Sequence, residues 1–266
     1  MAFKKVISPI KIFSESLGLE IIGLLKEFGR TTILFFDTIG AIFKGKVKGR
    51  HVMEQMVKIG IDSLPIALTS SFFVGMVFAI QIGNEFLKFG ASKFIGGVMG
   101  IAVARELAPA LTGIVIASRV AAAIAAEIGT MKVTEQIDAI KALGSDPVRY
   151  LVAPRFIAAT LMMPLLTIIA DLSAFIGGFI VAVYLVKVNS VDYINSAQQL
   201  LKLNDIYGGV FKSLIFGMII STIACYKGMR TRNGAKGVGE ATTSSVVISL
   251  ISLFVANYFL SVLLFK

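Results

Sequence analysis

Four charged residues interrupt an apolar stretch that is long enough to cross a bilayer. Arg105, Glu106, Arg119 and Glu127 lie in or next to residues 101–128, among alanines, valines and isoleucines. A charge in hydrocarbon is costly unless it is paired or hydrated, so these side chains should face protein or a cavity. At about 100° per residue, Arg105, Arg119 and Glu127 fall within about forty degrees of one helix face.

The positions of these charges along the stretch suggest two different roles. Arg119 and Glu127 lie toward the end that leads into a polar segment, and pairing with other helices is the favoured interpretation. Arg105 and Glu106 lie near the opposite end, just before Pro109. They could surround the mouth of a cavity and hold an anionic lipid headgroup, or they could only anchor the helix at the membrane interface.

A further acid, Asp171, lies at the centre of the apolar stretch from Phe156 to Val186. A lone acid inside a membrane helix could relay protons. It could also be hydrogen-bonded to a neighbouring helix through hydroxyl groups such as those of Thr167 and Ser173. The second interpretation is favoured because no other intramembrane acid lies nearby in the sequence.

The chain lacks the residue sets that catalysis or metal binding require. Cys225 is its one cysteine and His51 its one histidine, which argues against a disulfide or a metal site of the usual kinds. The heptapeptide GAIFKGK, at residues 40–46, resembles a phosphate-binding loop, but Val47 stands where Ser or Thr is needed and no strand precedes it. We therefore predict no catalytic residues, no metal and no cofactor in this chain.

A short polar-edged segment, Val133 to Leu143, follows the charged stretch and is too short to span a membrane. Thr134 is a plausible N-cap, Glu135 would lie in the first turn, and Gly144 fits the stop. Its apolar stripe consists of Val133, Ile137 and Ile140. A helix of this length needs something to bury such a stripe, either the membrane surface or a groove on a partner protein.

Two stretches carry small residues at every fourth position. A smooth ridge of this kind lets another helix approach closely, within one chain or between two copies. The first ridge consists of Gly113, Ala117, Ala121, Ala125 and Gly129, and the second of Gly209, Ser213, Gly217 and Ser221.

Composition identifies the class of protein that contains these features. The 266 residues are 56% hydrophobic and only 16% charged, which indicates an all-α integral membrane protein. The net charge of +10 flanks apolar runs, so it indicates membrane topology and anionic headgroups and not nucleic-acid binding. Five spans are predicted, at about residues 59–82, 101–128, 156–186, 210–226 and 246–265, with residues 84–100 as a short outside segment.

The N-terminal segment, residues 1–58, is predicted to form amphipathic helices that lie in the membrane interface. Ile10, Phe13, Leu17, Ile21, Leu24 and Phe28 recur at helical spacing. A second apolar piece, residues 31–43, is too short to cross and contains Asp37. Packing of this segment on the protein's own core is the alternative.

The distribution of Lys and Arg predicts the orientation. Most basic residues fall in the N-terminal segment and in the segments after the second and fourth spans, whereas the other side holds few, among them Lys88 and Lys93. The positive-inside rule then places the N-terminus in the cytoplasm and the C-terminus outside.

The stretch RELAPALTGIVIASRVAAAIAAEIGTMKVTEQIDAI, at residues 105–140, resembles the signature of the MlaE/YrbE family, the permeases of phospholipid-transporting ABC systems. Three further pieces are similar: GMVFAIQ at 75–81, DPVRYLVAPRF at 146–156 and ATTSSVV at 241–247. The resemblance covers about residue 50 to the C-terminus. Ser118 and Ala121 stand where small glycines are common in the family.

The resemblance implies a function and a set of partners. The permease, residues 59–266, would be a homodimer in the bacterial inner membrane. Cytoplasmic ABC ATPase subunits would carry ATP and Mg, and a periplasmic MCE-domain (MlaD-like) protein would sit on the outer face. The complex would move phospholipid between the inner and outer membranes and so maintain outer-membrane lipid asymmetry.

It also implies roles for particular residues. The short helix would be a coupling helix docked on the ATPase, through Glu135, Gln136, Ile137, Asp138 and Ile140. Phospholipid would occupy a cavity between the two copies, where Arg105 and Glu106 would meet the headgroup. The apolar wall of this cavity would be formed by Phe78, Phe86 and Phe89, which also follow one another as an apolar stripe in the sequence. Two other functions remain as alternatives, an ion-coupled secondary transporter that uses Asp171 and a non-transporting membrane scaffold.

Overall fold

A computed structural model describes residues 2–45 and 47–266, without the side chains of residues 2–17, 19, 20 and 24. Every regular element in this part of the chain is helical, which confirms the all-α prediction. The α-helices are α1 Ala2–Phe43, α2 Gly49–Ile59, α3 Leu64–Lys88, α4 Ile95–Ala102, α5 Ala108–Val133, α6 Gln136–Ala142, α7 Ala153–Tyr184, α8 Ser190–Leu200, α9 Leu203–Met229 and α10 Gly234–Phe265. Short 3-10 helices cover Ile61–Ser63 and Ser92–Phe94, and π-helices cover Val103–Leu107 and Val148–Val152.

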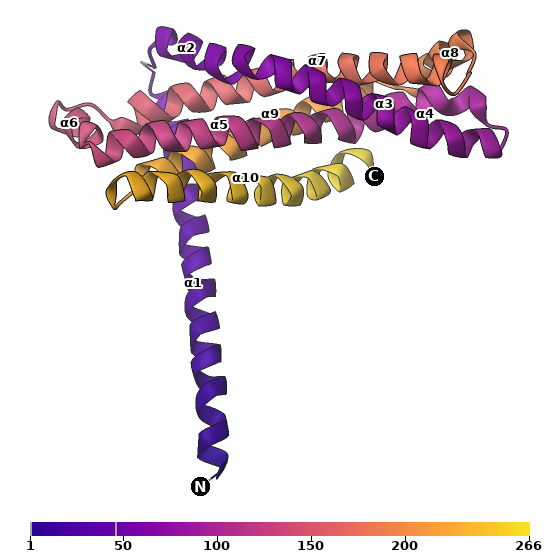
Figure 1. The fold of residues 1–266 in the computed structure, drawn as a ribbon. Helices are drawn as coiled ribbons and strands as arrows, with labels where there is room; N and C mark the ends of the chain where they lie inside the picture. Colours follow the sequence, from indigo (N-terminus) through magenta and orange to yellow (C-terminus); the bar gives the residue numbers. More distant parts are fainter. Residues whose placement is uncertain (1, 46) are drawn as a thin grey trace.

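Five of the described helical stretches are long and apolar enough to cross a membrane, as predicted. They are Gly49–Lys88, Ser92–Val133, Val148–Tyr184, Leu203–Met229 and Gly234–Phe265. The spans lie side by side along one long axis, with α6 at one end and α4 and α8 at the other (Figure 1). We call these the α6 end and the α8 end.

The central spans are α5 and α9, and the peripheral ones are α3 and α10. In the most apolar window of each span, 67% of the α9 residues are buried but only 11% of those of α10. The two ridges of small residues explain the close packing at the centre. A Cβ on Gly113 would lie 2.4 Å from Leu253 of α10, and one on Gly217 would lie 2.6 Å from the Ala159 carbonyl oxygen of α7. Both ridges are therefore used within one chain.

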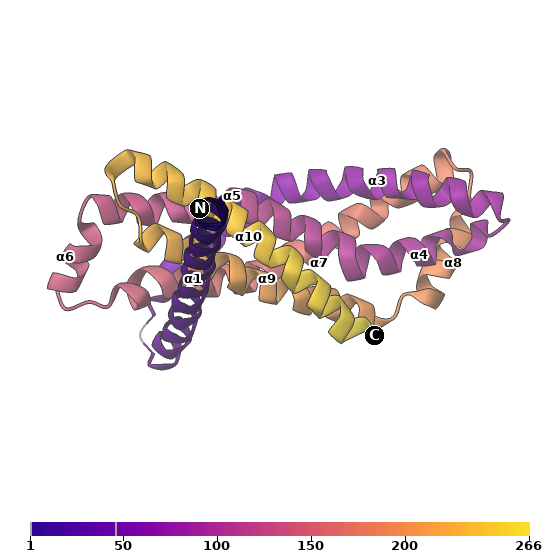
Figure 2. The same ribbon diagram turned by 90° about the horizontal axis from the view of Figure 1, so that it is seen from below.

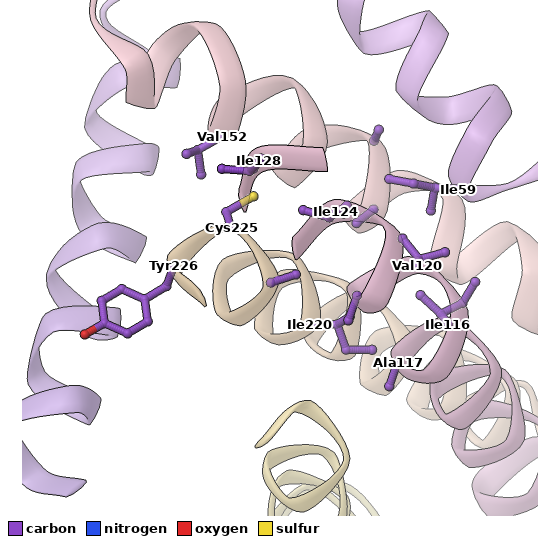
Figure 3. Close-up of a cluster of buried hydrophobic side chains, with 14 of the residues drawn as sticks. Ile59, Ile116, Ala117, Val120, Ile124, Ile128, Val152, Ile220, Cys225 and Tyr226 are labelled. Carbon is purple, nitrogen blue, oxygen red and sulfur yellow. The ribbon is translucent and has the colours of Figure 1, made fainter. Parts of the chain in front are cut away.

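A cluster of apolar side chains fills the bundle toward the α6 end (Figure 3). Ile116, Val120, Ile124 and Ile128 succeed one another at four-residue steps on α5, and all four are buried. They pack with residues of α2, α7 and α9, including Cys225, whose thiol is buried and unbonded. Residues at this spacing lie on one side of a helix, so these four form the face of α5 that packs in the cluster.

The helices α3 and α7 pack against each other in the same direction. The Ser173 hydroxyl donates to the Leu68 carbonyl at 3.0 Å, and further along both helices Gly177 lies against the Phe72 carbonyl. Parallel neighbours need a long connection. Here the connection includes a whole antiparallel span, α4–α5.

Residues 84–100 were predicted to form a short outside segment. Most of them are helical, as the end of α3 and the start of α4. The connection between the third and fourth spans contains a helix, α8, that was not predicted. Gly96 and Gly97 allow α8 to lie directly on α4, and the Gly97 amide donates to Ser196 at 3.1 Å. Gly96 and Gly97 are therefore contact positions between two helices.

The N-terminal segment also differs from the prediction, since one continuous helix, α1, replaces two shorter ones. It crosses the bundle near the α6 end and runs crosswise to the spans, with its N-terminus projecting away (Figures 1 and 2). Leu34, Thr38 and Ala41 near its C-terminus are buried, so this part packs on the protein's own core. The crosswise direction is the one expected of a helix in the membrane interface. Of the predicted apolar stripe, the side chains of Ile10, Phe13, Leu17 and Leu24 lie outside the described residues.

Candidate functional site

A cluster of opposite charges lies near the α8 end, where α5 meets α9 and α10. Its first pair joins Arg105, in the π-helix before α5, to Asp205 in the first turn of α9. The Arg105 Nε donates to Asp205 Oδ1 at 2.8 Å, and Nη2 lies 2.7 Å from the same oxygen. The other oxygen, Oδ2, accepts from the Lys202 amide at 2.9 Å, so Asp205 also caps the start of α9. Its side chain is only 2% exposed.

The second pair joins Glu106 to Lys212 of α9. The Lys212 ammonium, which is fully buried, donates to Glu106 Oε1 at 2.7 Å, to the Arg105 carbonyl at 2.9 Å and to Ser261 at 2.7 Å. Glu106 also accepts from Asn257 and Ser261 of α10. The ammonium thus has three acceptors, which is the number that it can satisfy.

The ring of Phe265 covers both cations of the cluster. Its centre lies 4.7 Å from the Arg105 guanidinium carbon and 5.0 Å from the Lys212 nitrogen. The side chains of Arg105 and Glu106 remain 33% and 42% exposed, respectively. Asp205 and Lys212 therefore hold the cluster from the inside, and Arg105 and Glu106 present charge on its outer side.

Sequence reasoning found Arg105 and Glu106 but missed Asp205 and Lys212. A signal was present, because a lysine inside an apolar span is as costly as the arginine that was noticed. Asp205 and Lys212 are also seven residues apart, which places them on one face of α9.

The three phenylalanines of the predicted apolar cavity wall do not share one environment. Phe78 and Phe86 are partly buried and pack on the apolar cluster around Met99 and Tyr193 of their own chain. Phe89 follows the end of α3 and is 82% exposed. The structure brings none of them to the charged cluster, so their role in binding lipid stays a prediction.

Arg119 and Glu127 belong to a second charged network, nearer the α6 end. Arg119 donates to the Lys58 carbonyl at 3.1 Å and to the Ser63 hydroxyl at 2.7 Å. Glu127 lies 3.3 Å from the Lys58 ammonium and 2.8 Å from the Arg155 guanidinium. The predicted pairing role of Arg119 and Glu127 is therefore confirmed, and the network links α2, α5 and α7.

The single charged face predicted for Arg105, Arg119 and Glu127 is wrong. The π-helix Val103–Leu107 inserts extra chain into the helical turn, so a constant 100° step does not carry Arg105 into register with the other two. Arg105 turns to α9, whereas Arg119 and Glu127 both turn to Lys58.

The short helix α6 begins later than predicted. Thr134 is not its N-cap, since the Thr134 hydroxyl donates back to the Thr130 carbonyl at the end of α5. Glu135 occupies the N-cap position with a left-handed backbone, φ 60°, and forms the corner between α5 and α6. The predicted stop is confirmed, since Gly144 has φ +73°.

The apolar stripe of α6 needs neither a membrane nor a partner to cover it. Ile137 is 2% exposed, and both Ile137 and Ile140 pack on the apolar cluster of their own chain. The surface left open carries Glu135, Gln136 and Asp138. A hydrogen bond from Lys132, 2.8 Å long, holds the pKa of Asp138 below its ordinary value. The polar members of the predicted docking set are therefore the accessible ones.

Asp171 lacks the hydrogen bond that was expected of it. Its Oδ1 is buried and has no partner among the described residues. The hydroxyl of Thr167 donates to the Met163 carbonyl and that of Ser173 to the Leu68 carbonyl. Within the described part of the chain no group of His, Cys, Asp and Glu could hold a metal ion.

One side of α10 is apolar and open along most of its length. Eight of its large apolar side chains are exposed, from Val247 through Ile251, Phe254 and Tyr258 to Leu263. The polar residues Asn257 and Ser261 lead from this helix into the charged cluster. An apolar surface thus adjoins the partly exposed charges of Arg105 and Glu106.

Comparison with known proteins places this architecture in a family. A family model described as permease MlaE matches residues 52–263. The chain belongs to the MlaE permease family. A probable ABC transporter permease protein of Synechocystis is 47% identical over 90% of this chain and 92% of that protein. One of Rickettsia typhi is 43% identical over 94% and 96%.

A plant relative is also similar to this MlaE-family permease. The chloroplast protein TRIGALACTOSYLDIACYLGLYCEROL 1 of Arabidopsis thaliana is 44% identical over 85% of this chain and 64% of that protein. The chain is thus the multi-pass permease subunit of an ABC transporter. Such a subunit works with an ATPase, and the ATP-hydrolysing chemistry belongs to that partner.

Proposed function

We propose that this permease moves phospholipid between the inner and outer membranes of a bacterium, driven by ATP hydrolysis on a partner ATPase that binds ATP and Mg. The observation that carries the proposal is the apolar open face of α10 next to the charged cluster. A phospholipid has the same two parts, acyl chains and a charged headgroup. The name of the Arabidopsis relative, which is that of a glycolipid, supports a lipid substrate.

A homodimer would place two open α10 faces around one shared lipid cavity. An isolated helix face with so many exposed apolar side chains fits either lipid or a second copy of the chain. In this arrangement Arg105 and Glu106 would stand at the headgroup level. A periplasmic MCE-domain protein would continue the route on the same side.

The α6 end would face the cytoplasm, with the N-terminus inside and the C-terminus outside in the inner membrane. Lys132, Lys141 and Arg149 near α6 and the basic residues between α9 and α10 support this orientation through the positive-inside rule. The open surface of α6, with Glu135, Gln136 and Asp138, would then dock on the ATPase. Movement there would reach the spans through the packing of Ile137 on the core.

The first test is native mass spectrometry of the complex, purified gently with the proteins that bind it. We expect two copies of the permease, two ATPase subunits and phospholipid adducts. A single chain without ATPase or lipid would contradict the proposal.

The second test uses the double variant Glu135→Ala, Asp138→Ala in reconstituted vesicles. Both side chains are exposed, so the fold should not change. ATP hydrolysis should continue in this variant, but it should no longer be coupled to lipid transport. The control is Asp171→Asn, whose transport should be retained. Loss of transport in Asp171→Asn together with dependence on a proton gradient would favour the secondary transporter instead.

A further inference from the structure

A pocket of about 500 Å³ lies at the α6 end, between α1, the end of α9 and the start of α10. It is lined by more basic than acidic side chains, namely Lys26, Arg30, Lys227, Arg230 and Arg232 against Glu27 and Glu240. It lies at the opposite end of the bundle from the Arg105–Glu106 cluster. The transport proposal therefore makes no use of it.

One face of α1 forms the first wall. Gly23, Lys26, Glu27 and Arg30 line the pocket, and their spacing of three, one and three residues puts them on one side of a helix. The opposite side carries Ile21, Leu25 and Phe28, all of them exposed. The helix thus has a polar face on the pocket and an apolar face away from it, as interfacial helices have.

The turn between α9 and α10 forms the second wall. Asn233 and Gly234 both have left-handed backbones, with φ 63°. A Cβ on Gly237 would lie 1.5 Å from the Arg232 carbonyl oxygen, so only glycine lets the turn close against α10. The turn thereby holds the backbone of Arg232 at the rim of the pocket.

Not all of the positive charge is compensated within the described residues. Lys227 is paired with Glu27, and Arg230 donates to the Tyr226 hydroxyl at 2.7 Å and stacks on its ring. The remaining cations, Lys26, Arg30 and Arg232, have no ion-pair partner among the described side chains. A concave site with several uncompensated cations favours an anion.

A second, more open groove continues from this pocket along α10. The two share Glu240 and Ser244, and the groove runs on past Thr243 to Val247 and Ile248. Beyond it lies exposed Ile251. The surface therefore changes from basic to apolar within about three helical turns, roughly 16 Å.

We propose that this pocket binds the phosphate-bearing headgroup of an anionic phospholipid from the leaflet at the α6 end, with an acyl chain along the α10 groove. The basic wall fits the headgroup and the apolar continuation fits a chain, which a free phosphate ion lacks. The bound lipid bridges α1 to the α9–α10 turn. The headgroup pocket is separate from the Arg105–Glu106 cluster, whereas the acyl-chain groove reaches Val247 and leads to Ile251, which also belong to the open α10 face used in the proposed function.

The test measures lipid retained by the purified complex in native mass spectrometry. The complex is supplied with phosphatidylglycerol, phosphatidylethanolamine or inorganic phosphate. We compare the wild type with the double variant Arg30→Gln/Arg232→Gln. The control is the double variant Lys44→Gln/Lys48→Gln, which removes two exposed basic residues outside the pocket. Each cation near an anionic surface contributes about fivefold in affinity, so the first variant should retain at least about fivefold less phosphatidylglycerol.

The control should retain phosphatidylglycerol like the wild type, and excess inorganic phosphate should not displace the lipid. Equal retention of phosphatidylglycerol by the wild type and the double variant Arg30→Gln/Arg232→Gln would overturn the proposal. So would equal binding of phosphatidylethanolamine, or full displacement by inorganic phosphate, which would show a site for a free anion. Transport is measured separately from lipid retention at the α6 end. A negative result for retention therefore does not decide the transport proposal.

Discussion

The two charged networks of this permease are built from the same residue types but differ in burial. Near the α8 end, Asp205 and Lys212 are almost entirely enclosed, and each is matched by a partner that fixes it between helices. Toward the α6 end, Lys58 and Glu127 are 57% and 41% exposed, and only Arg155, at 6%, is enclosed. Buried pairs are costly to break one partner at a time, whereas exposed pairs contribute little and exchange readily with water.

This difference suggests a division of labour between the two ends. The cluster near the α8 end holds α5, α9 and α10 in a fixed arrangement around its outward charges. The network toward the α6 end includes the exposed Lys58–Glu127 pair, a kind of contact that exchanges readily with water. In the function proposed above, the α6 end responds to the ATPase, and the second kind of contact suits that role.

The largest effect should come from Lys212→Met. It leaves Glu106 without its cation and the Arg105 carbonyl without the Lys212 donor, which should destabilise the fold by about 3–5 kcal/mol. Thermal unfolding in detergent would measure the loss. The double variant Lys212→Met, Glu106→Gln should recover much of the stability. If the single variant is as stable as the wild type, the cluster does not hold α5, α9 and α10 together.

A smaller effect is expected for Glu127→Gln toward the other end. Arg155, only 6% exposed, would lose its carboxylate, at a cost of about 1–3 kcal/mol. The same thermal measurement gives the comparison. A loss as large as that of Lys212→Met would remove the contrast between the two networks.

Arg119→Gln should change stability by at most about 1 kcal/mol. Its ion-pair partner Asp62 is half-exposed and 3.8 Å away, and Gln can still donate to the Ser63 hydroxyl. Transport at several ATP concentrations would show whether the contact affects function without affecting stability. A large drop in melting temperature would show that this end is as rigid as the other.

The smallest effect concerns pH and Asp138. Its pKa lies below the ordinary value of 3.8, so the folded state favours the charged form. The contact with Lys132 therefore contributes above that pH and is lost only as the pH falls through the lowered pKa. Between pH 5 and 8, docking to the ATPase should not change through this residue, as measured by co-purification. A change in that range that Asp138→Asn abolishes would contradict the assignment.

The sequence predicted the spans well because membrane helices leave a strong signal in composition. Arg119 and Glu127 were found as pairing residues since a charge in an apolar run must have a partner. Their partners could not be named, because Lys58 and Arg155 come from helices whose neighbours depend on packing. Burial of Ile137 likewise required knowing that the α5–α6 corner folds back on the core.

Two of the misses share one physical cause, which is backbone geometry that composition does not encode. Gly96 and Gly97 are contacts for α8, which was not predicted. The π-helix before α5 has no side-chain signature either. It decides that Arg105 and Glu106 turn to α9 and α10 and not toward Lys58.

That π-helix also acts as a rotational offset between the two halves of one span. In an uninterrupted α-helix, Gly97 and Gly113 would lie about 160° apart around the axis, whereas one extra residue reduces this to about 60°. The surface that receives α8 and the surface that receives α10 thus come onto one flank. A single-residue deletion in Val103–Leu107 would keep the helix continuous and yet turn α4 away from α8 by about a quarter of a revolution. The span behaves as two helices whose relative angle is set by five residues.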